Sequence, residues 1–184
     1  GVERVSASIG QIRYFDPQLV QLTPTSKTTH FTGSNYVGNL ELSLSDNWRL
    51  TAPQQWNPNT DETDVSTVGI QRRIGTDGVL NFSYRYRRDL LEQVDVSGEI
   101  PLNANWNLIG RYDYSLRDRK VIDAFAGVEW DSCCTAARVL VRRYVRDLQG
   151  DVNNAVFFEV EFKGLGAYGQ KTEDFLHHAI LGYQ

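Results

Sequence analysis

The chain has 184 residues, of which 41% are hydrophobic and 23% are charged, enough for one domain with a sizeable core. Its net charge of −4 and isoelectric point near 5.4 exclude the strongly basic surface that is typical of nucleic-acid-binding proteins. No run of 18 apolar residues predicts a transmembrane helix and residues 1–20 carry no signal-peptide pattern, so a membrane protein remains possible only as a β-barrel.

Apolar and polar residues alternate along almost the whole chain, with no convincing helical period. The segment from Asp16 to Asn35, which contains Pro17, Pro24 and many Thr and Ser, predicts one long exposed loop. The pattern elsewhere predicts about ten strands, at 4–14, 35–45, 48–57, 63–73, 79–88, 92–101, 106–117, 120–131, 135–146 and 153–164.

Short turn signals separate these strands, so neighbouring strands are expected to be antiparallel. Most strands are about ten residues long, the length that a tilted membrane-spanning strand needs. Trp48, Trp56, Trp106 and Trp130 lie near strand ends, where the aromatic girdles of membrane barrels are found, although core packing accounts for them as well. We therefore predict an all-β fold, the C-terminal portion of a larger antiparallel up-and-down transmembrane β-barrel formed by residues 1–164.

Periodicity alone does not say which face of a strand is inside. A soluble lipocalin-like barrel or a sandwich also alternates, with its apolar face inward, so it stays open as an alternative. The tail 165–184 carries Phe175, Leu176, Ile180, Leu181 and Tyr183. This segment is too apolar to remain solvent-exposed, and it is expected to dock on the periplasmic rim, inside the barrel or on a partner.

Cys133 and Cys134 are the only two cysteines, and they are adjacent in a predicted turn. Adjacent cysteines close on each other only through a strained ring, so each is expected to need a different partner outside this chain. With no Met in the chain, this predicts a fragment of a larger protein. Strand parity puts the cysteines at the end opposite the long loop. If that loop is on the outer side of an outer-membrane barrel, the cysteines face the oxidising periplasm.

Several stretches together resemble the C-terminal part of the lipopolysaccharide (LPS)-assembly protein family LptD. The stretches are Asn-Leu-Ile-Gly-Arg-Tyr-Asp-Tyr-Ser-Leu-Arg-Asp-Arg at 107–119, Ala-Gly-Val-Glu-Trp-Asp-Ser-Cys-Cys at 126–134, Arg-Arg-Tyr-Val at 142–145, Phe-Lys-Gly-Leu-Gly at 162–166 and Tyr-Arg-Tyr-Arg-Arg-Asp at 84–89. The resemblance covers residues 36–184 well and the first 35 weakly.

The resemblance implies an outer-membrane translocon that delivers lipopolysaccharide to the outer leaflet and is not an enzyme. It implies an LptE-like plug lipoprotein and an LptA-like periplasmic bridge reached through a missing N-terminal domain. It also implies that Cys133 and Cys134 form disulfides with cysteines nearer the N-terminus of the whole protein.

Two groups of residues follow as site candidates. The inward-facing charges expected to line the lumen are Arg85, Arg87, Asp95, Glu99, Arg111, Asp113 and Arg117, and a salt-bridge lattice explains them equally well. The resemblance implies that the last strand forms one wall of a seam that opens sideways for lipid. The side chains of that strand are Asn154, Val156, Phe158, Val160 and Phe162.

Catalytic and metal sites are not expected. The three histidines are His30 in the long loop and the adjacent pair His177 and His178 in the tail, and no nucleophile is placed beside them. The acidic segment 61–64 lacks the calcium-loop pattern. No cofactor is predicted, and a diffusion porin or a soluble binding module remains the alternative function.

Overall fold

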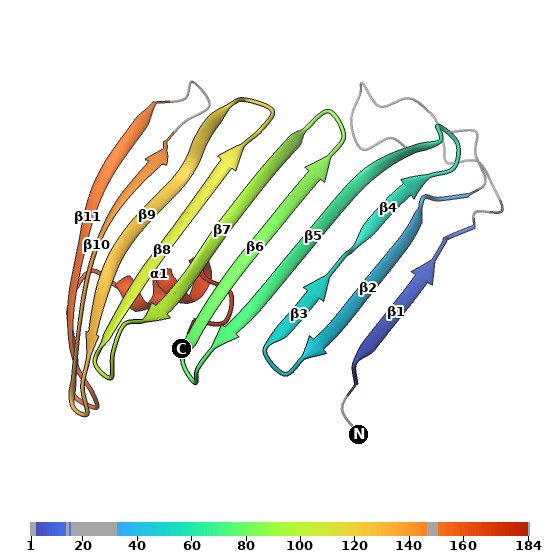
Figure 1. The fold of residues 1–184 in the computed structure, drawn as a ribbon. Coiled ribbons are helices and arrows are strands. Elements are labelled where there is room, and N and C mark those ends of the chain that lie inside the picture. Colours follow the sequence, from blue (N-terminus) through green and yellow to red (C-terminus); the bar gives the residue numbers. More distant parts are fainter. Residues whose placement is uncertain (1–2, 14, 16–32, 147–150, 184) are drawn as a thin grey trace.

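The computed structural model describes residues 3–13, 15, 33–146 and 151–183. Twelve strands form a single antiparallel sheet, and the strands follow one another across the sheet in chain order (Figure 1). The strands are β1 (Val5–Gly10), β2 (Tyr36–Ser45), β3 (Trp48–Thr51), β4 (Gln54–Asn57), β5 (Glu62–Ile74), β6 (Gly78–Arg87), β7 (Leu91–Pro101), β8 (Trp106–Ser115), β9 (Lys120–Asp131), β10 (Thr135–Val145), β11 (Val152–Phe162) and β12 (Gly166–Gly169), and one helix follows, α1 (Thr172–Ala179). This confirms the predicted all-β antiparallel fold.

Several elements differ from the predicted ones. The expected strand 4–14 ends at Gly10, and the expected strand 106–117 ends at Ser115. The expected strand 48–57 is divided into β3 and β4 at Ala52 and Pro53, because proline has no N–H to donate to a ladder. Both halves still pair with β2 and β5. The tail, in which no helical period was expected, contains the short strand β12 and the helix α1. Eight residues are too few for a helix to be stable without tertiary contacts, so a weak sequence signal is expected there.

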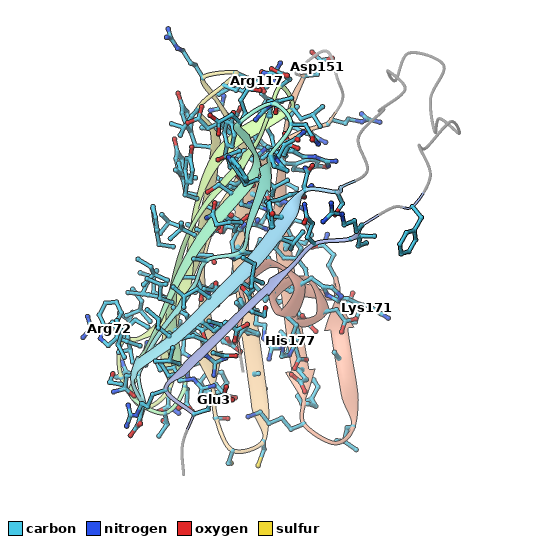
Figure 2. The ribbon with its side chains drawn as sticks, turned by 90° about the vertical axis from the view of Figure 1, so that its right-hand side faces the viewer. Glu3, Arg72, Arg117, Asp151, Lys171 and His177 are labelled. Atoms are coloured by element: carbon cyan, nitrogen blue, oxygen red, sulfur yellow. The ribbon has the colours of Figure 1, made fainter. Side chains whose placement is uncertain are left out.

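The two faces of the sheet have opposite character. On one face large apolar side chains are exposed, for example Phe82 at 42% and Tyr112 at 49%. Other exposed members of this face are Val96, Leu108, Val128, Val139, Val141, Val156 and Phe158. The sheet curves, and α1 lies on its concave side, whereas the labelled Arg72 projects from the convex side (Figure 2). The apolar face is therefore convex and outward, which argues against the soluble-barrel alternative.

The only continuous apolar core in the described residues lies under α1. Val79, Ile109, Phe125 and Leu140 come from β6, β8, β9 and β10 and share the concave face. From the tail, Leu176, Ile180 and Tyr183 pack against them. The tail therefore packs on the concave face of the sheet.

Strand parity is as predicted. The turns after β2, β5, β7 and β9 share one end of the sheet, toward which α1 also lies, and the connections that follow β1, β6 and β8 share the other end (Figure 1). Most of the long connection after β1 lies outside the described residues. The described helix α1 is neither long nor apolar enough to cross a membrane.

Candidate functional site

A network of ion pairs crosses the concave face near the middle of the sheet. The Arg111 guanidinium on β8 lies 2.6 Å from Asp95 on β7 and 3.7 Å from Asp113 on its own strand. Arg85 on β6 reaches the same Asp113 at 3.4 Å. The four side chains share the concave face because residues paired in an antiparallel ladder point to the same face, and the ladder sets Asp95 directly opposite Asp113. Arg111 contacts both of these carboxylates and Arg85 contacts Asp113, which offsets their mutual repulsion.

The structure brings together four of the seven residues predicted to line the lumen and separates the other three from them. Glu99 lies toward the other end of β7, where it is buried and accepts a hydrogen bond from Asn107 at 2.9 Å. Arg87 is exposed at the end of β6. Arg117 lies beyond the end of β8, at the rim, where it donates to the Asp89 carbonyl oxygen (Figure 2). Arg117 is therefore a rim residue, because β8 ends at Ser115, two residues before the predicted boundary.

A second charge cluster surrounds Arg138 on β10. Its guanidinium lies 2.8 Å from Glu129 on β9 and 3.0 Å from Glu161 on β11, and all but 7% of its side chain is buried. The Tyr183 hydroxyl in the tail donates to Glu129 at 2.6 Å. Burial and the neighbouring Glu129 raise the pKa of Tyr183. The hydroxyl therefore stays protonated at physiological pH and serves as the donor.

Glu159 on β11 holds the start of α1. Its carboxylate accepts backbone N–H groups of Thr172 at 2.7 Å and Glu173 at 2.9 Å. The residue at the N-cap position, Lys171, makes no side-chain cap hydrogen bond, so Glu159 supplies the cap from another strand. A carboxylate at a helix N-terminus is also favoured by the helix dipole.

The far end of the tail is tied to the opposite part of the sheet. The Leu181 carbonyl oxygen accepts hydrogen bonds from Gln71 on β5 at 3.1 Å and from Asn81 on β6 at 2.9 Å. Together with Glu159, these contacts stretch the tail across the concave face from β11 to β5. The tail therefore connects strands that are far apart in the sheet.

Sequence reasoning missed Arg138, Glu129 and the capping role of Glu159. The same two-residue alternation that selected Arg111 places Arg138 and Glu129 on the concave face, so that signal was present. Their importance depends on Tyr183 and α1, whose position follows from no local pattern.

The free edge of β11 is only partly covered. β12 pairs with residues 159–162 of β11, and Gln170 donates its N–H to the Phe158 carbonyl oxygen at 3.0 Å. Within the described part of the chain, residues 152–157 of β11 have no strand on that side. Asn154 and Val156 thus lie in the uncovered part, and Phe158, Val160 and Phe162 lie where β12 begins to cover the edge.

Gly169 allows β12 to approach this closely. Its φ of 122° is in a region that side-chain-bearing residues rarely adopt, and a Cβ there would stand 2.2 Å from the Phe158 carbonyl oxygen. β12 can therefore lie against β11 only with glycine at this position.

The two cysteines lie in the turn between β9 and β10, and both are exposed and free. Their sulfur atoms are 2.9 Å apart. Hydrogen bonding to Cys133 raises the pKa of the Cys134 thiol. The Cys134 carbonyl oxygen accepts the Lys163 N–H at 3.0 Å, which ties this turn to the one after β11. The thiols are thus presented outward from the same end of the sheet as α1.

A comparison with known proteins relates this geometry to a family. Residues 1–108, more than half of the chain, match the family described as LptD, LPS transport system D. The chain belongs to the LptD family. The LptD match begins at residue 1, so the resemblance that was expected to be weak over the first 35 residues extends through them.

Curated LptD proteins align with the whole chain. It is 41% identical over 189 residues to the LPS-assembly protein LptD of Xylella fastidiosa strain 9a5c. It is 40% identical over 196 residues to the LPS-assembly protein LptD of Xanthomonas campestris pv. campestris strain 8004. In both alignments all of this chain is covered but only 24% of the relative, so the chain spans about a quarter of the length of these LptD proteins.

Proposed function

We propose that the chain is the C-terminal wall of an outer-membrane barrel that assembles lipopolysaccharide into the outer leaflet. The observation that carries this proposal is the distribution of side chains on a curved sheet, apolar on the convex face and charged on the concave face. A membrane-spanning barrel needs this arrangement, because lipid contacts its outside and water its inside. The LPS-assembly role is inferred from the LptD family to which the chain belongs and from the LPS-assembly proteins that it resembles.

The partners belong to the same proposal. An LptE-like plug lipoprotein would meet the concave face, an LptA-like bridge would connect through a domain outside this chain, and lipopolysaccharide would leave where β11 meets the first strand of the barrel. The partial cover of β11 supports such a seam: β12 occupies residues 159–162, so only residues 152–157 are left to pair with another strand and few ladder hydrogen bonds would have to break. Nothing in the proposal requires catalysis by this chain, a metal or a cofactor.

A lysine scan of the two faces tests the membrane placement. The test uses the parent protein, meaning the full-length LptD protein that contains this chain. We expect Phe82→Lys, in the middle of β6 on the convex face, to destabilise it by about 2–4 kcal/mol, because a charge then faces hydrocarbon. Ser83→Lys is the matched control, since the next residue points to the concave face beside Asp95. The measurement is folded yield in the outer membrane, judged by heat-modifiable electrophoretic mobility. Equal yields for the two variants would contradict the proposal.

The cysteines provide a test of the family role. In the full-length parent protein, we expect Cys133→Ser and Cys134→Ser each to remove a different long-range disulfide, because adjacent cysteines need separate partners. Both disulfides would lie on the periplasmic side and tie this turn to residues outside the chain. Non-reducing electrophoresis with peptide mapping measures this. If both thiols are free in the mature protein, or bonded to each other, a porin becomes the better proposal.

Transport is tested by locking the seam. A disulfide between Val156→Cys on β11 and a cysteine facing it on the first barrel strand of the parent protein is expected to stop the arrival of lipopolysaccharide at the cell surface until a reductant is added. A cysteine pair across β9 and β10, at Val128 and Val139, is the control, because that ladder stays closed in any lateral opening. Undiminished transport through a locked seam would overturn the lateral route.

A further inference from the structure

A groove crosses the convex face of the sheet between β6 and β11, with a cavity volume of about 720 Å³. This volume lies within the range of small-molecule and cofactor sites. Small residues on the central strands form its floor, namely Gly98, Gly110, Ala124 and Ala126. Larger side chains rise on either side, Leu80 and Val96 toward β6 and Val141 and Val156 toward β11.

The depth of the groove follows from how closely the strands approach there. A Cβ on Gly98 would stand 2.5 Å from the Val79 carbonyl oxygen and 2.7 Å from a methyl carbon of Leu80. Position 98 therefore has room only for glycine, and the groove cannot be filled from that strand without moving the backbone of its neighbour.

Three arginines line this largely apolar groove, and two of them already have acidic partners, Arg111 with Asp95 and Arg142 with Asp123. Arg143 on β10 is exposed, and no described residue forms an ion pair with it. Arg72 also lies on the convex face. Its guanidinium carbon is 5.3 Å from the centre of the Trp48 ring, so it already has an aromatic partner. An arginine without a partner on a surface facing hydrocarbon is costly, and a guanidinium is suited to bind phosphate with two parallel hydrogen bonds.

From this combination we infer that the groove binds one acyl chain of lipopolysaccharide, with a lipid phosphate against Arg143. This inference rests on the proposed function. Arg143 lies two residues from the end of β10, at the end of the sheet opposite the cysteine turn, which the proposed orientation places in the outer leaflet. Asn154 and Val156, on the uncovered stretch of β11, line the groove too. A lipid leaving the seam therefore reaches the groove without crossing another strand.

Site-specific photocrosslinking in the full-length parent protein tests the site. A photoreactive amino acid replaces Val141, which lines the groove, or Val139, which is exposed on the same strand and face but does not line it. The parent is reconstituted in vesicles containing equal amounts of lipopolysaccharide and phosphatidylglycerol. We expect position 141 to crosslink lipopolysaccharide at least several-fold more than position 139 does.

Two substitutions then separate the contributions of charge and shape. Arg143→Gln is expected to lower crosslinking at position 141 about tenfold, the usual loss for a charge-assisted hydrogen bond. Ala126→Leu is expected to lower it by filling the floor. The matched controls are Arg72→Gln and Ala137→Leu, which change the same residue types on the same face outside the groove and are expected to have little effect.

The inference is overturned if positions 141 and 139 crosslink alike, if Arg143→Gln changes nothing, or if phosphatidylglycerol is the lipid captured. Because vesicle binding needs no transport, these crosslinking results can fail while the proposed function stands, so the two failures are distinguishable. That function fails if the parent protein moves no lipopolysaccharide to the cell surface, whatever the crosslinks show.

Discussion

Replacing Arg138 with Met is expected to lower the free energy of unfolding of the full-length barrel by about 3–5 kcal/mol. This is the range for breaking a buried ion pair by removing one partner. Because Met keeps much of the apolar volume of the Arg side chain, the loss of stability is attributed to removal of the positive charge. Glu129 and Glu159, both buried, would remain on the concave face without the cation that lies between them. The measurement is the urea midpoint in detergent micelles, followed by tryptophan fluorescence.

The control for this prediction is Arg87→Met, which removes the same charge from an exposed position at the end of β6. It is expected to change stability by less than about 0.5 kcal/mol. A double variant with Glu129→Gln should recover part of the loss, because the two residues form one network. If Arg138→Met and Arg87→Met unfold at the same midpoint, the Arg138 cluster does not stabilise the fold.

Shortening Leu176 to Ala is expected to cost about 2–5 kcal/mol and to release the tail from the concave face. The Leu176 side chain is completely buried between α1 and the strands, so its removal leaves a cavity in the only continuous core of the described residues. The detached tail should show a higher rate of tryptic cleavage at Lys171, because local opening exposes the backbone there.

Leu181→Ala is the matched control for this second prediction. Leu181 lies in the same tail but is 73% exposed, so the same truncation removes almost no buried contact. Its cleavage rate should remain that of the unsubstituted protein. Equal cleavage of both variants would mean that the tail is held by its hydrogen bonds to Glu159, Gln71 and Asn81 and not by its apolar residues.

Only part of the candidate site could be predicted from the sequence. Alternation identified Arg85, Asp95, Arg111 and Asp113 as neighbours on one face, and pairing between strands brings them together. Arg117 was assigned to that face by extending β8 into its turn. Arg138 was overlooked because a charged residue gains its importance from burial, and here burial depends on a helix that lies more than 30 residues further along the chain.

The sequence by itself determined most of the strands, their antiparallel order and the end at which each turn lies, because a period of two and short turn signals are local properties. It did not predict β12 or the break between β3 and β4. Only the tertiary structure decided which face is concave, since alternation has the same period whichever way a sheet curves. Only the tertiary structure placed α1 as well. A helix of eight residues is not stable alone, and it forms where Glu159 caps it and where the concave face buries Leu176 and Ile180.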